Sequence, residues 1–138
     1  HLKNVVFAGF RPRTELPRFF ALSDVFVFPT LGDPYGLVVD EAMASSLPVI
    51  ATTVAGEIRD RVQSGVTGWL VRPENTEDLT AAMKQAAAHP DMREAMGAEC
   101  AKRMSSSHPK NWARDFVEQV TEIAGFPRTG SMPFQVRK

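Results

Sequence analysis

The sequence lacks three features that each mark a class of protein: paired cysteines, an excess charge of one sign, and a long apolar run. Its single cysteine, Cys100, excludes an intramolecular disulfide framework and makes a reducing compartment the default expectation. Sixteen Lys and Arg balance sixteen Asp and Glu, so no overall field attracts nucleic acid. No apolar run approaches the ~20 residues that cross a bilayer. We therefore expect a soluble, cytoplasmic protein without a nucleic-acid partner.

What is present is an alternation of short apolar runs with longer segments of helical period, which is typical of β-α units that build a parallel sheet. The predicted strands are residues 5–8, 25–28, 48–51 and 69–71. The predicted helices are residues 14–22, 36–45, 76–88, 91–104 and 110–123, with Thr14 and Thr76 as N-caps of the first and third. A run without either period, residues 126–138, is predicted to be an irregular tail.

One segment, PTLGDPYGLVVDEAMA at residues 29–44, runs from the end of a predicted strand through a loop into a helix. Open α/β sheets bind ligands beyond the carboxyl ends of their strands, where helices begin with free N–H groups. Gly36 would let the backbone approach a diphosphate, with the amides of Gly36 and Leu37 as donors. Glu41, roughly 7 Å along the helix, would reach a ribose, and Asp33 a sugar.

The same segment has a plainer interpretation. Its apolar residues could form a buried helix, or a strand because paired valines disfavour helix, with Asp40 and Glu41 as solvated charges. Local spacing alone favours this interpretation, because two acids at a fixed offset are a weak motif.

Five blocks of sequence, in order, favour the functional interpretation. They read SDVFVFPT at residues 23–30, GLVVDEAMA at 36–44, PVIAT at 48–52, AGE at 55–57 and GVTGWLVRP at 65–73. Together, residues 9–73 resemble the second half of the C-terminal domain of retaining GT-B glycosyltransferases of family 4, the glycosyl transferases group 1. The resemblance implies an α/β fold with an incomplete, Rossmann-like, doubly wound parallel sheet over residues 1–125.

The resemblance also implies an activity, the transfer of a sugar from a nucleoside-diphosphate-sugar donor with retention at the anomeric carbon. Its pair of acids falls on Asp33, as the catalytic residue that meets the sugar, and on Glu41, which binds the ribose. The other donor-binding positions are Tyr35, Gly36, Leu37 and Val38. Asp33 stands where the family has glutamate, one methylene longer, and Ser46 stands where it usually has a glycine in a left-handed helix cap. No metal and no cofactor besides the donor is implied.

Parts of the resembling enzymes have no counterpart in this sequence. Their Arg and Lys that neutralise the diphosphate lie upstream of the matched region, and an N-terminal domain provides the acceptor site and any contact with a membrane surface. In the usual strand order 3-2-1-4-5-6, two strands would lie between residues 5–8 and 25–28. We therefore expect the chain to be an inactive piece of a longer protein, or to re-pair its sheet edges, or to associate with another copy.

Rival functions are a GT-B nucleotide-sugar epimerase or a phosphorylase, a non-catalytic module that only binds the nucleotide sugar, and a structural fragment without a ligand. Residues outside the five blocks are expected to be structural. They are surface histidines (His1, His89 and His108), a buried Cys100, a solvated basic face (Arg11, Arg13 and Arg18) and methionines that pack the helical layer (Met83, Met92, Met96 and Met104).

Overall fold

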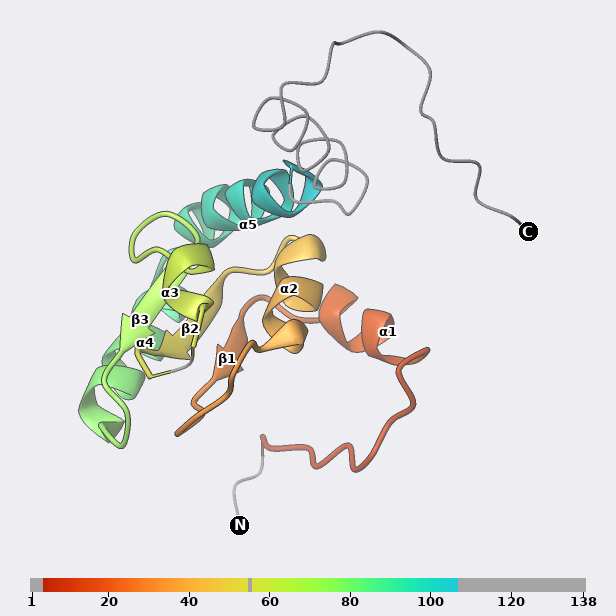
Figure 1. Ribbon diagram of the computed structural model, residues 1–138, viewed down its shortest axis with the longest axis horizontal. Helices are drawn as coiled ribbons and strands as arrows, with labels where there is room; N and C mark the ends of the chain where they lie inside the picture. Colours follow the sequence, from red (N-terminus) through yellow and green to blue (C-terminus); the bar gives the residue numbers. More distant parts are fainter. Residues whose placement is uncertain (1–3, 55, 107–138) are drawn as a thin grey trace, which may run out of the picture. The chain divides into compact units, whose positions relative to one another are not determined.

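The computed structural model describes residues 4–54 and 56–106 (Figure 1). The chain divides into two compact units, His1–Ser105 and Ser106–Lys138. The predicted helix at 110–123 and tail at 126–138 lie outside the described residues, as do His1 and His108. The domain boundary predicted at residue 125 therefore stays a prediction.

The first unit is built on a three-stranded parallel sheet, as the alternating pattern predicted. Its strands are β1 (Phe26–Phe28), β2 (Val49–Thr52) and β3 (Gly68–Val71), in the order β1-β2-β3. The register places Val27 opposite Ile50, and Ile50 opposite Trp69. All four residues of β2 are buried, because a central parallel strand is covered on both faces.

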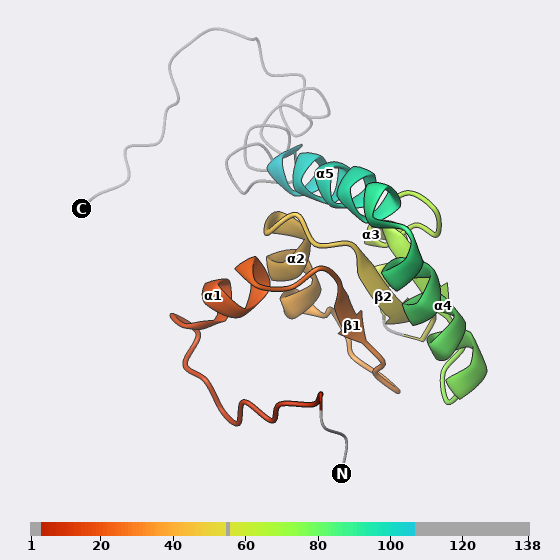
Figure 2. The same ribbon diagram turned by 180° about the vertical axis from the view of Figure 1, so that it is seen from behind.

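Helices cover both faces of this sheet, so the α/β, doubly wound class is confirmed. Figure 1 shows α2 and α3 in front of the sheet, and Figure 2 shows α4 on the opposite face. Side chains of β2 alternate between two cores, with Val49 and Ala51 in the core of α2 and α3, and Ile50 in the core of α4. The helices are α1 (Leu16–Ala21), α2 (Leu37–Ala44), α3 (Ile58–Arg61), α4 (Thr76–Ala88) and α5 (Pro90–Ser106).

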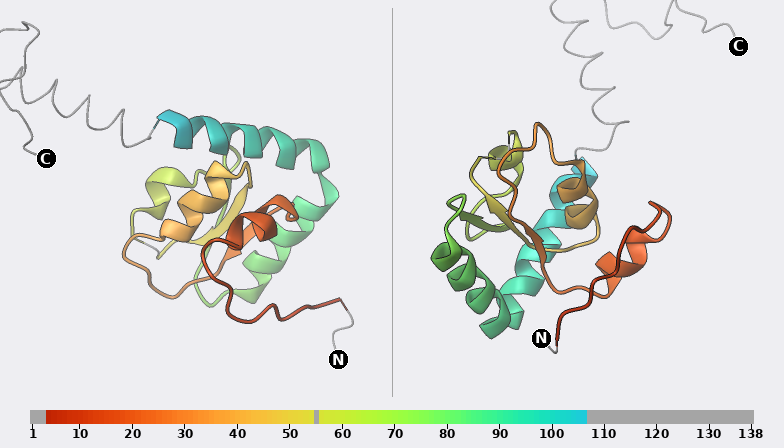
Figure 3. Two further views of the ribbon diagram at one scale, coloured as in Figure 1. Left: turned by 90° about the vertical axis from the view of Figure 1, so that its right-hand side faces the viewer. Right: turned by 90° about the horizontal axis from the view of Figure 1, so that it is seen from below.

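Helix α5 crosses the amino ends of the strands and does not cover their carboxyl ends (Figure 3). Gly97 of α5 lies against the residues that lead into β2, since an added Cβ would stand 2.2 Å from the carbonyl oxygen of Ser46. One turn further, the Sγ of Cys100 donates to the carbonyl of Thr67, just before β3, at 3.3 Å. Both contacts are at the amino end of the sheet.

Several sequence-based expectations are wrong. Residues 5–8 form no strand, because a strand requires a hydrogen-bonded neighbour and the described sheet order does not include them. They do not re-pair with β1 either. Phe7 is 94% exposed. The predicted caps shift by one residue, since Glu15 caps α1 without a side-chain bond and the Asn75 side chain accepts from the amide of Asp78 at the start of α4.

The remaining structural expectations have mixed outcomes. Cys100 and Met96 are buried, Met92 and Met104 pack against the cores, but Met83 is exposed on the outer side of α4. His89 is an exposed surface residue, as predicted. Helix α3 was not predicted, because four residues are too few for a helical period to be visible.

Ser46 occupies the left-handed position at the end of α2, with φ of 61°. Its amide donates to the carbonyl of Met43 at 3.0 Å, and the amide of Leu47 donates to Ala42 at 3.1 Å. These two bonds define a Schellman motif, which glycine normally completes. The helix cap is thus retained although serine replaces the usual glycine, at the cost of a strained backbone.

We expect Ser46→Gly to raise the free energy of unfolding by about 1 kcal/mol, because glycine adopts positive φ without a Cβ clash. Urea denaturation measures the change. Ser45→Gly is the matched control: its φ is −87°, so glycine there relieves no strain. It adds freedom to the unfolded chain and removes the hydrogen bond from the Ser45 hydroxyl to the carbonyl of Glu41, and both changes lower stability. Equal effects at the two serines would contradict the strain at Ser46.

Cys100 is expected to resist thiol reagents in the folded chain. It has no exposed surface, and burial raises its pKa to about 11, so at pH 8 only ~0.1% is thiolate. Labelling with a chromogenic disulfide should therefore follow unfolding, and the single cysteine makes the signal specific to one site. A native-state labelling rate equal to that in denaturant would show that the thiol is accessible.

Candidate functional site

The loops that follow the strands meet at the carboxyl end of the sheet, and the segment predicted to carry the chemistry is one of them. The loop after β1 is joined to the end of β2 by a hydrogen bond from Thr52 Oγ1 to the carbonyl of Thr30, at 2.5 Å. Thr52 is 3% exposed, so this bond is shielded from water. The start of the loop is therefore fixed to the central strand.

Polar side chains within the loop give it a defined turn. The Oγ1 of Thr30 accepts from the amide of Gly32 at 3.1 Å, and Oδ1 of Asp33 accepts from the amide of Tyr35 at 2.9 Å. The second bond is an Asx turn, in which aspartate takes the place of a backbone acceptor. Asp33 is half-buried and directs the chain into Gly36, so it has a local structural role at the position predicted to meet a sugar.

Gly36 is the N-cap of α2 and has a left-handed backbone, φ 71° and ψ 52°. An added Cβ would lie 2.8 Å from Cδ1 of Ile58, which is fully buried in α3. Glycine is thus required here for two reasons, its conformation and the close approach of α3. Gly36 itself is buried, whereas Leu37, the first residue of the helix, is 62% exposed.

Glu41 lies on α2 and is engaged by an arginine from the segment before α1. The Nη2 of Arg13 donates to Oε1 of Glu41 at 2.6 Å. The Arg13 side chain is 81% exposed and that of Glu41 is 28% exposed. An ion pair this open contributes at most about 1 kcal/mol, so a ligand hydroxyl can replace the arginine at modest cost.

The other predicted site residues differ in what they can offer a ligand. Tyr35 is 44% exposed, and its ring is within reach of solvent. Val38 is half-buried against the cluster of Phe20, Ala42 and Leu47 between α1 and α2, so any contact it makes with a ligand falls to its backbone. Residues 37–44 are helical, as both interpretations of the segment allowed.

Arg61, at the end of α3, is a residue of the site that sequence reasoning missed. It donates through Nη1 to Oδ1 of Asp40 and through Nη2 to the carbonyl of Tyr35. Its guanidinium carbon also lies 4.4 Å from the centroid of the Tyr35 ring. These partners are 21 and 26 residues away along the chain, and no local pattern in the sequence signals such a pairing.

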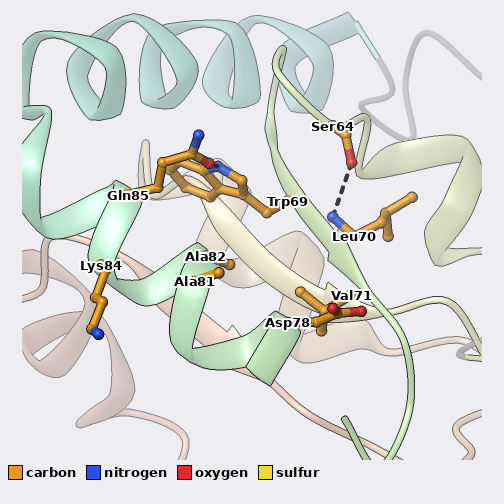
Figure 4. A pocket seen from close by; sticks show the side chains of 9 residues that line it. All are labelled: Ser64, Trp69, Leu70, Val71, Asp78, Ala81, Ala82, Lys84 and Gln85. Carbon is orange, nitrogen blue, oxygen red and sulfur yellow. Dashed lines mark hydrogen bonds between the residues drawn. The ribbon is translucent and has the colours of Figure 1, made fainter. Parts of the chain in front are cut away.

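Two hollows lie near the sheet, and neither is lined by the predicted site residues. One, of about 160 Å³, is at the carboxyl end between Leu31, Thr52 and Arg72. The other, of about 560 Å³, lies along the outer side of β3 and α4 (Figure 4). Figure 4 shows the side chains of Trp69 and Gln85 there. The Nε1 of Trp69 donates a hydrogen bond to Oε1 of Gln85 at 2.7 Å.

Residues 4–54 and 56–106 contain no group of three or more His, Cys, Asp or Glu that could hold a metal ion. None of the helices in these ranges is long and apolar enough to span a bilayer.

Gly36→Ala is expected to lower the free energy of unfolding by about 2 kcal/mol, because the new methyl group meets Ile58 and the left-handed backbone is strained. Urea denaturation of the chain measures the loss. Gly32→Ala is the control from the same loop: an added Cβ meets nothing within 4 Å. A loss at Gly32 as large as that at Gly36 would contradict the packing of α3 against Gly36.

Comparison with known proteins identifies several relatives. Over 94 residues the chain is 38% identical to the sulfoquinovosyl transferase SQD2 of Arabidopsis thaliana, a match that covers 67% of this chain and 18% of the relative. Over 121 residues it is 31% identical to the D-inositol 3-phosphate glycosyltransferase of Kribbella flavida, covering 88% of this chain and 27% of that protein. The chain thus matches about a quarter or less of the length of these relatives.

Solved structures share the fold. Sucrose-phosphate synthase from Thermosynechococcus elongatus matches with a TM-score of 0.73 and 28% identity, over 87% of this chain and 29% of that one. The Anabaena protein HepE, in complex with UDP and glucose, matches with a TM-score of 0.72 and 24% identity, over 90% of this chain and 32% of that one. This chain thus spans about a third or less of each of these structures.

The sequence profile of one family, described as glycosyl transferases group 1, matches residues 1–89. These residues include all three strands, the loop with Asp33 and Gly36, and the α2 helix with Glu41. The match confirms the resemblance that the five sequence blocks indicated. The chain belongs to the glycosyl transferases group 1 family.

Proposed function

We propose that this chain provides the donor site of a glycosyltransferase that moves a sugar from a nucleoside diphosphate to an acceptor with retention at the anomeric carbon. One observation carries the proposal. Helix α2 begins, with a left-handed Gly36, at the carboxyl end of a parallel sheet, and a carboxylate lies on either side of that start, Asp33 before it and Glu41 after it.

The start of α2 suits a diphosphate. Amides in the first turn of a helix have no partner within the helix, and the helix dipole adds a partial positive charge there. Gly36 contributes its left-handed backbone to this helix start, and the amides of Gly36 and Leu37 are the donors proposed for the phosphate oxygens. When the bond between the anomeric carbon and the phosphate oxygen breaks, these donors would stabilise the negative charge that develops on the leaving group.

The two carboxylates are proposed to hold the groups on either side of the diphosphate. Glu41 would accept the ribose hydroxyls in exchange for Arg13, whose open ion pair is easily replaced. Asp33 would accept hydroxyls of the transferred sugar. Its bond to the Tyr35 amide uses one acceptor position of Oδ1, and a carboxylate has about four, so the Asx turn and the sugar contact are compatible.

The comparisons support a glycosyltransferase with a nucleotide-sugar donor and indicate a first donor to test. The related proteins are named as transferases of sulfoquinovose and as glycosyltransferases of D-inositol 3-phosphate, and the structurally similar HepE was crystallised with UDP-glucose. We therefore put UDP first among donor nucleotides. An acceptor domain and further cationic residues for the diphosphate would come from outside the matched quarter of such proteins.

Donor binding should raise the melting temperature of the chain, because a ligand that binds only the folded state stabilises it. The experiment is a titration with UDP-, GDP- and ADP-glucose. A donor at 100 times its Kd adds about 2.7 kcal/mol, which corresponds to several degrees. Glu41→Ala should abolish most of the increase in melting temperature. Glu94→Ala removes an exposed carboxylate on α5 and should retain the increase.

Turnover by the whole protein then separates the remaining functions. Sugar transfer that is lost in Glu41→Ala supports a transferase, whereas donor binding without any turnover supports a binding module. Interconversion of the donor sugar without an acceptor would indicate an epimerase. A chain and a whole protein that bind no donor would contradict the proposal.

A further inference from the structure

One arginine, Arg61, contacts the loop that carries Asp33 and Gly36. Arg61 lies in none of the five sequence blocks that resemble the family. Its guanidinium joins three parts of the proposed donor site: the backbone of Tyr35, the ring of Tyr35 and the carboxylate of Asp40 on α2. Its side chain is only 14% exposed. Arg61 is thus placed between the loop and the helix at the point where one becomes the other.

The geometry uses the particular shape of arginine. A planar guanidinium can donate from two nitrogens in different directions while its face lies against an aromatic ring. Here Nη1 and Nη2 take one partner each, on α2 and on the loop. A lysine ammonium would reach one of these acceptors as a point charge and would not stack on Tyr35 in the same way.

The arrangement is not the one that maximises stability. Nε of Arg61 is buried, and within residues 4–54 and 56–106 it has no hydrogen-bond partner. A buried donor without an acceptor is a cost, and a buried ion pair is weak support for stability in general. What the three contacts do provide is a fixed position for the residue that precedes Gly36.

We propose that Arg61 is a positioning residue for the donor: it fixes Tyr35 and Asp40 so that Gly36 keeps its left-handed conformation and the first amides of α2 point to the diphosphate. The inference rests on the proposed donor site. In this scheme Arg61 acts on the donor through Tyr35 and Asp40, to which its terminal nitrogens donate. Its effect comes from organising the site before the ligand arrives.

The test compares donor affinity with folding in the whole protein, at a temperature where circular dichroism shows each variant folded. Arg61→Lys should raise the Kd for the UDP-sugar about tenfold, and Arg61→Met should raise it further. Arg59→Lys is the matched control. Arg59 lies on the same short helix but donates to the carbonyl of Thr53 at 2.9 Å, whereas Arg61 donates to Tyr35 and Asp40, so the Kd of Arg59→Lys should stay within about twofold.

A second measurement reports on the loop without a donor. In Arg61→Lys, amide hydrogen exchange should become faster at Tyr35, Gly36 and Leu37. Exchange in β2 should remain unchanged, because only the loop loses its contacts with the guanidinium. If an Arg61 variant does not fold, Asp40→Asn tests the same ion pair from the Asp40 side. This variant should also raise the Kd for the UDP-sugar.

The outcomes separate the two proposals. A wild-type protein that binds donor, with unchanged Kd and unchanged loop exchange in folded Arg61→Lys and Asp40→Asn, overturns the positioning role and leaves the donor site intact. A wild-type protein that binds no nucleotide sugar overturns both. Raised Kd with faster loop exchange in a folded variant, and a normal Arg59→Lys, supports the positioning role.

Discussion

The burial of β2 on both faces is the constraint on which the rest of this unit depends. Because β2 is covered on each side, it must pair with β1 and β3, and its alternating side chains divide the interior into two cores. Helix α5 then closes the amino end of the sheet. The carboxyl end, where the loops after the strands gather, holds polar side chains and irregular backbone, and the proposed donor site is there.

Two residues of α3 determine the shape of that site. Ile58 at the start of α3 packs so close to Gly36 that no side chain fits, while Arg61 at its end holds the preceding residue through hydrogen bonds and a ring contact. A helix of one turn is thus enough to fix the entry to α2 from two directions. The site is therefore organised by packing against α3, and its proposed ligand contacts come from α2 and the loop before it.

The sequence was sufficient to predict the elements whose signal is local. The strands predicted at 25–28, 48–51 and 69–71 match β1, β2 and β3 to within one residue at each end, and the helix predicted at 76–88 matches α4. The position of Gly36 at the start of α2 was also predicted. What could not be predicted depends on distant partners. Residues 5–8 have the composition of a strand but no neighbour to pair with, and the links of Arg61 to Asp40 and of Arg13 to Glu41 join segments more than 20 residues apart.

The exposed pair of Arg13 and Glu41 has a consequence for the effect of salt. Dissolved ions usually weaken the binding of an anionic ligand, because they screen its attraction to the protein over about 8 Å at physiological ionic strength. The same ions also loosen Arg13 from Glu41, and the ribose that would take its place is neutral. On the proposed assignment, added salt therefore opposes binding at the diphosphate and favours binding at the ribose. Ionic strength would then change the donor affinity less than the charge of the diphosphate alone suggests.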